Sequence, residues 1–248
     1  GHIIGHRFGL DHGMENMFPQ DANFNTSAYK TMENEMANWI DLGQEVRISV
    51  TTSKYDGDLP AKVEVSYVVA DPETGDMIYR RQKRFSNDDK QVYKRLSRGD
   101  YGSTYRHRSI RRIKMADATS ADLTIEVGEM IVENFEYRDD SWQSLSLVAT
   151  FFEGSEECSG YQYFSDGSFE AGGVKNFGEF LDKLLELREH MEKNGEGAFV
   201  QCLIHVTKPD YALRIQYEHE DPERWWPSGP SADMSAFAEL LRPASSAG

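Results

Sequence analysis

The charge of this chain changes abruptly near its middle, and this division constrains the fold more than any other feature. Residues 1–114 contain 18 Lys and Arg against 16 Asp and Glu, a formal charge of +2. Residues 115–248 contain 9 against 26, a formal charge of −17, and the two parts give the −15 of the whole chain. A chain of 248 residues has room for two domains of ordinary size. We therefore expect two units of unlike charge that meet just before Met115.

Apolar periodicity predicts helices and strands in both units. In the first unit it predicts a helix that begins at Thr26 or Ser27, ends near residue 42 and is apolar along a face that includes Ile40. Strands are expected at residues 45–51, 62–70 and 77–85, with a hairpin turn at 71–75. The second unit reads αββαββα, with elements at 120–135, 142–152, 159–165, 177–191, 198–207, 211–219 and 231–241. This order predicts the α+β class with a mostly antiparallel sheet.

Composition excludes several classes of protein. No stretch approaches the roughly 18 consecutive apolar residues of a membrane span, so we expect a soluble chain with no membrane partner. The chain opens on Gly1 without a basic region followed by an apolar segment, and no export signal is expected in it. Cys158 and Cys202 are too few for a disulfide framework and lack a neighbouring His pair, which predicts buried free thiols.

Basic residues are concentrated at the end of the first unit. Residues 77–114 carry 13 basic against 3 acidic side chains. We interpret residues 88–114 as a basic linker or tail, and Arg80, Arg81, Lys83 and Arg84 as a surface that suits a phosphate backbone. A merely solvated basic run is the alternative.

Three side chains near the start have the functional groups that phosphodiester hydrolysis requires. The reaction needs a base that activates water, a cation, and side chains that hold both in place. His2 can act as the base, while Asn25 and Glu33 offer oxygen ligands. Glu33 follows Asn25 by eight residues, about two helical turns, so both are expected on nearly the same helix face.

The sequence around these residues resembles the DNA/RNA non-specific endonuclease family, and more narrowly the branch at the C-termini of bacterial polymorphic toxins. The resemblance rests on GHIIGHRFG at 1–9, NMFPQDANFN at 16–25 and YKTME at 29–33. It implies a single-metal ββα nuclease core over residues 1–87. The family has an additional strand and usually an Arg before the His, whereas this chain begins at the motif itself.

The same resemblance implies roles for individual residues. His2 matches the general base, Asn25 the direct Mg²⁺ ligand and Glu33 the carboxylate that holds the metal's waters, while Asn16 and Gln20 match supporting positions. His2 must be neutral to accept a proton, so activity should fall at acidic pH. DNA or RNA would be held through phosphates, which we assign to the basic side chains Arg7, Lys30, Arg80, Arg81, Lys83 and Arg84.

The second unit resembles the YezG-type immunity proteins that accompany such nucleases. The runs IQYEHEDP at 215–222, WWPSGP at 225–230 and MSAF at 234–237 carry this resemblance. It implies a cytoplasmic inhibitor over residues 115–248, bound to a nuclease whose parent toxin is secreted or delivered into competitor bacteria. The candidate inhibitory surface consists of Glu218, Glu220, Asp221, Trp225 and Trp226.

Two alternatives remain open from the sequence. In one, the nuclease half lacks its upstream strand and is an inactive ligand, so the chain is a toxin–immunity binding complex without enzymatic activity. In the other, the basic segment makes the chain a nucleic-acid chaperone. That alternative predicts salt-sensitive binding without cleavage.

Overall fold

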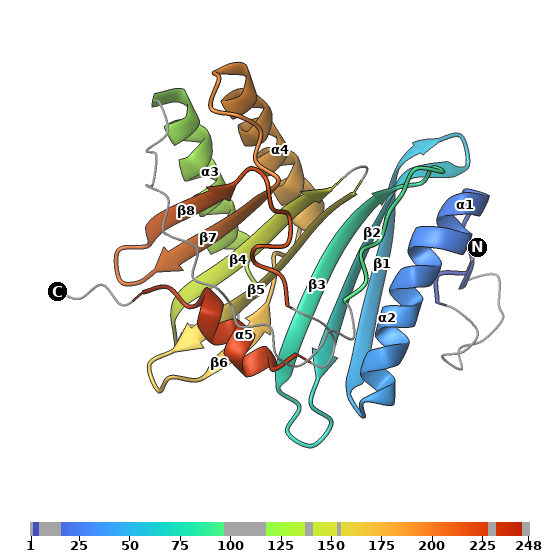
Figure 1. Cartoon of the computed structure of the whole chain (residues 1–248), viewed down its shortest axis with the longest axis horizontal. Helices are drawn as coiled ribbons and strands as arrows, with labels where there is room; N and C mark the ends of the chain where they lie inside the picture. The colour runs from blue at the N-terminus through green and yellow to red at the C-terminus, as the bar shows by residue number, and fades with distance from the viewer. Residues whose placement is uncertain are drawn as a thin grey trace.

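One eight-stranded sheet runs through both halves of the chain (Figure 1). The structure is a computed structural model that describes residues 2–4, 16–96, 118–136, 141–152, 155–227 and 232–244. The strands are β1 (Glu45–Asp56), β2 (Leu59–Ala70), β3 (Met77–Ser86), β4 (Trp142–Phe152), β5 (Ser155–Phe164), β6 (Phe169–Gly172), β7 (Gln201–Thr207) and β8 (Ala212–Glu218). The helical segments are α1 (Ala22–Phe24), η3 (Asn25–Tyr29), α2 (Lys30–Asp41), α3 (Ala118–Asn134), α4 (Phe177–Lys193) and α5 (Met234–Leu241).

All strand pairs in this sheet are antiparallel, which confirms the predicted class and sheet type. The order is β1-β2-β3-β5-β4-β7-β8, and β6 pairs with β5 beside this path. The two halves of the chain therefore meet where β3 pairs with β5. Because one sheet contains strands from both halves, the sheet does not separate them into two units. The proposed division before Met115 therefore stays a prediction.

The first half is a three-stranded meander covered by α2. The predicted hairpin turn is present, with the Asp71 side chain accepting hydrogen bonds from the backbone N–H groups of Glu73 and Thr74. β1 and β2 are longer than expected and meet in a second tight turn at Gly57, where φ is +60°. Residues near this turn are polar, so hydrophobic alternation did not reveal them as strand.

The helical segment starts earlier than predicted. Asp21, rather than Thr26 or Ser27, is the N-cap, and its carboxylate accepts hydrogen bonds from the backbone N–H groups of Asn23 and Phe24 at 2.9 and 3.0 Å. A side-chain oxygen at this position satisfies N–H groups that have no partner inside the helix. The apolar face is buried as predicted, except for Ile40, which is exposed.

Residues 118–244 contain a hydrophobic cluster of their own. α3 and α4 cover one face of β4, β5, β7 and β8, and α5 lies on the opposite face (Figure 1). This cluster runs from Val127 to Ile215 and holds the two free thiols of Cys158 and Cys202, which are buried as predicted. Among the described residues, the order departs from αββαββα by one short strand, β6. None of the described helices is long and apolar enough to cross a bilayer.

The segment after β3 requires a correction. Residues 88–96 were predicted to be part of a basic tail, yet the side chains of Gln91, Tyr93 and Leu96 are buried. The Leu96 N–H donates to Glu35 of α2 at 2.6 Å, which ties this segment to the helix. The first half therefore extends at least to residue 96, and residues 97–114 of the predicted tail lie outside the described residues.

Candidate active site

The His2–Ile4 segment is held in place by Asn16. A single antiparallel bridge joins His2 to Met17, and the Ile3 N–H donates to the Asn16 carbonyl at 2.9 Å. The Asn16 side chain adds two hydrogen bonds to the Ile4 backbone: it accepts from the Ile4 N–H at 3.0 Å and donates to the Ile4 carbonyl at 2.9 Å. Asn16 thus fixes the backbone two residues after His2.

Tyr29 connects this segment to the helix. Its hydroxyl donates to the Ile3 carbonyl at 2.6 Å, and its ring is buried against Phe18 and Phe24. Burial raises the pKa of Tyr29, and the nearby carboxylate of Glu33 raises it further. Tyr29 and Glu33 are also four residues apart, one helical turn, so their side chains lie on the same side of the helix.

Asn25, Tyr29 and Glu33 follow each other at intervals of four residues. Side chains four apart are neighbours on a helix surface. Residues Asn25–Tyr29 form a π turn, which is wider than an α turn and holds more residues. In a regular α-helix, eight residues leave an angular offset of about 80°. The π turn reduces this offset, which favours the predicted alignment of Asn25 with Glu33.

Glu33 lies at the edge of the protein interior. It is 5% exposed and forms an ion pair with Lys30, with 3.5 Å between Nζ and Oε2. The Lys30 side chain itself is about half exposed, so its ammonium remains accessible to a phosphate. Asn25 is partly buried and is the first residue of the π turn.

Gln20 has unused hydrogen-bonding groups. Both polar atoms of its amide are buried without a partner among the described residues, which is costly unless a water or an ion is present. The loop that carries Gln20 is fixed by Asn87, whose amide donates to the Pro19 carbonyl and accepts from the Asp21 N–H.

These groups fit a hydrated Mg²⁺. The amide oxygen of Asn25 and the carboxylate of Glu33 are hard oxygen ligands, and Mg²⁺ usually keeps several waters, which an unpaired amide such as Gln20 can bind. Among the described residues, no group of three or more His, Cys, Asp or Glu side chains forms a metal site. The fit therefore rests on one carboxylate, two amides and water.

The family model for DNA/RNA non-specific endonuclease matches residues 1–70. The match contains His2, Asn16, Gln20, Asn25, Tyr29 and Glu33, and it ends with β2. It supports a nuclease of the hydrolase class, with nucleic acid as substrate, for this part of the chain. No curated protein matches the chain.

Beyond this endonuclease-like segment, the predicted phosphate-binding surface on β3 requires a correction. Arg80, Arg81, Lys83 and Arg84 are all buried, with exposures of 8% or less. Their charged groups contact carboxylates of the second half instead of facing solvent, because β3 is covered on both faces. Arg7, the remaining candidate for phosphate contact apart from Lys30, lies outside the described residues.

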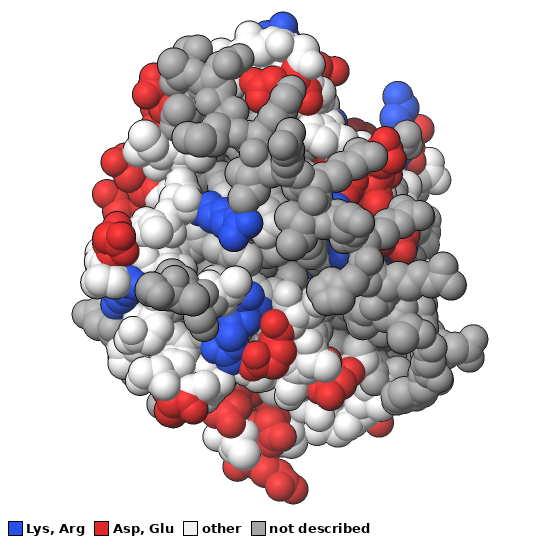
Figure 2. All heavy atoms as spheres, turned by 60° about the vertical axis from the view of Figure 1, so that its left-hand side comes forward, with Lys and Arg blue, Asp and Glu red and all other residues white. Residues whose placement is uncertain are grey.

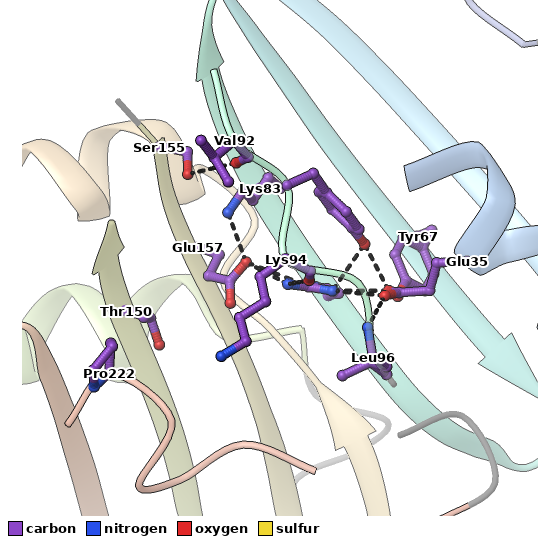
Figure 3. A network of polar contacts seen from close by, with 12 residues as sticks. Glu35, Tyr67, Lys83, Val92, Lys94, Leu96, Thr150, Ser155, Glu157 and Pro222 are labelled. Atoms are coloured by element: carbon purple, nitrogen blue, oxygen red, sulfur yellow. Dashed lines mark hydrogen bonds and ion pairs between the residues drawn. The ribbon is translucent and has the colours of Figure 1, made fainter. Parts of the chain in front are cut away.

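Sequence reasoning missed Glu35, the most fully bonded carboxylate in the first half. It is completely buried and accepts hydrogen bonds from the hydroxyls of Tyr67 and Tyr93, the Leu96 N–H and the Arg81 guanidinium. Figure 3 shows Glu35 between Tyr67 and Leu96. The available signal was its position between Met32 and Met36 on the apolar face of α2. A carboxylate at such a place needs buried partners.

The candidate inhibitory residues differ in what they contact. Trp226 reaches the first half, with its ring 4.7 Å from the Arg81 guanidinium carbon. Asp221 is near enough to Lys94 to affect the pKa of that ammonium, which burial lowers and Asp221 raises. Glu218 pairs instead with Arg224 of its own half, at 2.7 Å, and Trp225 lies 5.0 Å from Arg224. Glu220 is exposed.

Proposed function

We propose that residues 1–96 form the core of a magnesium-dependent endonuclease that cuts DNA or RNA without sequence preference, and that residues 118–244 restrain it. The observation that carries the proposal is the contact of Tyr29 with the His2–Ile4 segment. This hydrogen bond ties the segment that carries His2 to the helix that carries Asn25 and Glu33, inside the region that matches the endonuclease family model, and so supports one shared site.

Each residue has a defined task in this proposal. His2, as a neutral imidazole, accepts a proton from the attacking water. Asn16 positions His2 through the backbone of Ile4. Asn25 provides the direct oxygen ligand, and Glu33 orients water molecules around the ion. When bound, Mg²⁺ supplies positive charge that stabilises the phosphorane and the departing oxygen.

Substrate contact is proposed to involve phosphates only. Lys30 is exposed at the start of α2, one turn before Glu33, and can pair with a backbone phosphate. Contacts to phosphate and sugar carry no direct sequence information. A site made in this way accepts many sequences.

We further propose that the two halves are a toxin and its immunity protein joined in one chain. Two features support this: the opposite charges of the halves, and the burial of the basic residues of β3 by residues 118–244. In such a system the immunity part acts in the cytoplasm and the nuclease is delivered to competitor cells. Figure 2 shows acidic side chains in several separate groups on the face in view, not in one DNA-like patch.

The test is nicking of supercoiled plasmid by the full chain carrying a protease site between residues 97 and 117. After cleavage and separation of the halves, the first half should nick plasmid with Mg²⁺ and not with EDTA. Re-addition of the second half should suppress nicking, and His2→Ala should abolish it. If the separated and folded first half cuts nothing, the chain is instead a binding complex without nuclease activity.

A further inference from the structure

β3 and β5 are both edge strands of their own halves. β3 is the last strand of the first meander, so β2 pairs with one of its edges. At its other edge, residues Gln82–Phe85 pair with Ser155–Cys158 of β5. β6 occupies the same edge of β5 further along, from Gly160 to Tyr163. The docking segment is therefore a short stretch at the start of β5. An exposed strand edge has unpaired N–H and C=O groups that can bond another strand, and charged side chains on the edge restrict which strand can pair.

On one face of the joined sheet, Glu157 forms ion pairs with two basic residues of β3. Its Oε2 lies 2.8 Å from Nη2 of Arg81 and 3.0 Å from Nζ of Lys83, and all three side chains are buried. Figure 3 shows Lys83 pointing toward Glu157. Burial would raise the pKa of Glu157, but the two cations outweigh this and lower it, so the carboxylate stays ionised. The aromatic ring of Trp226 covers Arg81.

The opposite face has its own set of contacts. Arg84 donates to Glu156 at 3.1 Å, to Asp182 at 2.8 Å and to the Gly178 carbonyl at 2.8 Å. The Gln82 amide makes two hydrogen bonds with the backbone of Val174, at 2.8 and 3.0 Å. Because successive strand residues point to opposite faces, the sequence Arg81-Gln82-Lys83-Arg84 is matched on both faces at once.

We propose that residues 118–244 are a binding module that captures a polypeptide by strand addition at the β3 edge, and that they recognise basic side chains on both faces of that strand. The partner is an edge strand with basic side chains on both of its faces, as β3 has. The proposal refines the restraint proposed above and rests on it for its biological role. Strand addition supplies affinity through main-chain hydrogen bonds, while the side chains of alternate residues supply specificity.

The contacts between β3 and β5 lie away from the helical segment that is tied to His2–Ile4. The contacts described above involve β3, whereas α1 and the start of the helix lie beyond β1 and β2, away from β4, β7 and β8 (Figure 1). The strand pairing and its charge pairs are thus made at β3, with further ion pairs from Lys54 of β1 to Asp182 and from Lys94 to Glu223. Its charge pairs are buried, so removal of one partner leaves an uncompensated charge.

The test uses the full chain with the protease site between residues 97 and 117, and measures association of the cut halves by gel filtration and titration at about 0.15 M salt. The cut wild-type halves should remain together. Glu157→Lys should weaken association by about 100-fold or more, because it places a cation against Arg81 and Lys83 in place of their shared carboxylate. Glu189→Lys, on the exposed side of α4, is the matched control and should have no effect.

A second pair of variants keeps the test decisive. Adding Lys83→Glu to Glu157→Lys should restore part of the lost affinity. If circular dichroism shows that Glu157→Lys does not fold, the double variant Glu156→Gln with Asp182→Asn replaces it and should also weaken association. Wild-type halves that separate on dilution, or equal behaviour of Glu157→Lys and Glu189→Lys, would overturn the proposal. No nuclease measurement enters this test, so it can fail or succeed independently of the proposed enzymatic activity.

Discussion

Arg81 of β3 and Glu157 of β5 form a buried ion pair in which Nε and Nη2 of the guanidinium both donate to Oε2, at 3.2 and 2.8 Å. The other side of the same guanidinium contacts Glu35 at 2.8 and 3.1 Å. Arg81 therefore links the helix of the endonuclease-like half to the acidic half. A single basic residue thus has one carboxylate partner within its own half and one across the boundary.

Glu35→Gln should destabilise the chain strongly. The substitution keeps the shape of the side chain but removes the negative charge that faces Arg81 in a fully buried network. Loss of one partner of a buried ion pair costs about 3–5 kcal/mol of unfolding free energy. Urea denaturation followed by circular dichroism measures this. Glu45→Gln, on the exposed start of β1, should leave the midpoint unchanged, and equal midpoints for both variants would rule out this role of Glu35.

Tyr29→Phe separates positioning from stability. It removes the hydroxyl that donates to the Ile3 carbonyl and should cost about 1–3 kcal/mol in stability. Mg²⁺-dependent nicking by the released first half should fall by about 10- to 100-fold, because His2 loses its fixed position relative to the helix. Tyr55→Phe, on an exposed residue, is the control. An unchanged nicking rate in Tyr29→Phe would contradict the assigned site.

His205 should make stability dependent on pH. Burial lowers its pKa from 6.5 to about 4, and the positive charge of Arg214 acts in the same direction, against the hydrogen bond to Leu241. The unfolded state therefore binds a proton that the folded state excludes between pH 6.5 and 4. The stability that uncharged His205 gives the folded state is fully present above pH 6.5. As the pH falls toward 4, the free energy of unfolding decreases by about 3 kcal/mol.

Equilibrium unfolding at a series of pH values tests this. His205→Leu should flatten the slope across that interval, whereas His190→Gln, at the exposed end of α4, should keep it. A slope that persists in His205→Leu would assign the pH dependence to other groups.

The mode of restraint predicts a difference between large and small substrates. Residues 118–244 contact β3, and the proposed site at His2 lies apart from these contacts. The uncut chain should then hydrolyse a small chromogenic phosphodiester with Mg²⁺ at a rate within about threefold of the released first half, while plasmid nicking rises by about 100-fold or more on release. Suppression of both reactions in the uncut chain would show that the site itself is covered.

Sequence patterns predicted most of the elements but misplaced their ends. Alternation located β2 and β3, and the element expected at residues 177–191 is α4, which ends two residues later. The turn at Gly57 and the cap at Asp21 were missed, because backbone hydrogen bonds between polar residues have no hydrophobic signature. The endonuclease motif identified His2, Asn16, Asn25 and Glu33 as candidates without their contacts.

The sequence by itself determined the elements, the unlike charges of the halves and the residues that resemble an endonuclease site. Only the tertiary structure decided that Arg80, Arg81, Lys83 and Arg84 are buried, because the exposure of a strand depends on which other strand pairs with it. It also decided that Tyr29 bonds the Ile3 backbone and that Glu35, in the middle of α2, bonds Arg81 of β3. Both depend on contacts between residues more than 20 positions apart, which no local pattern specifies.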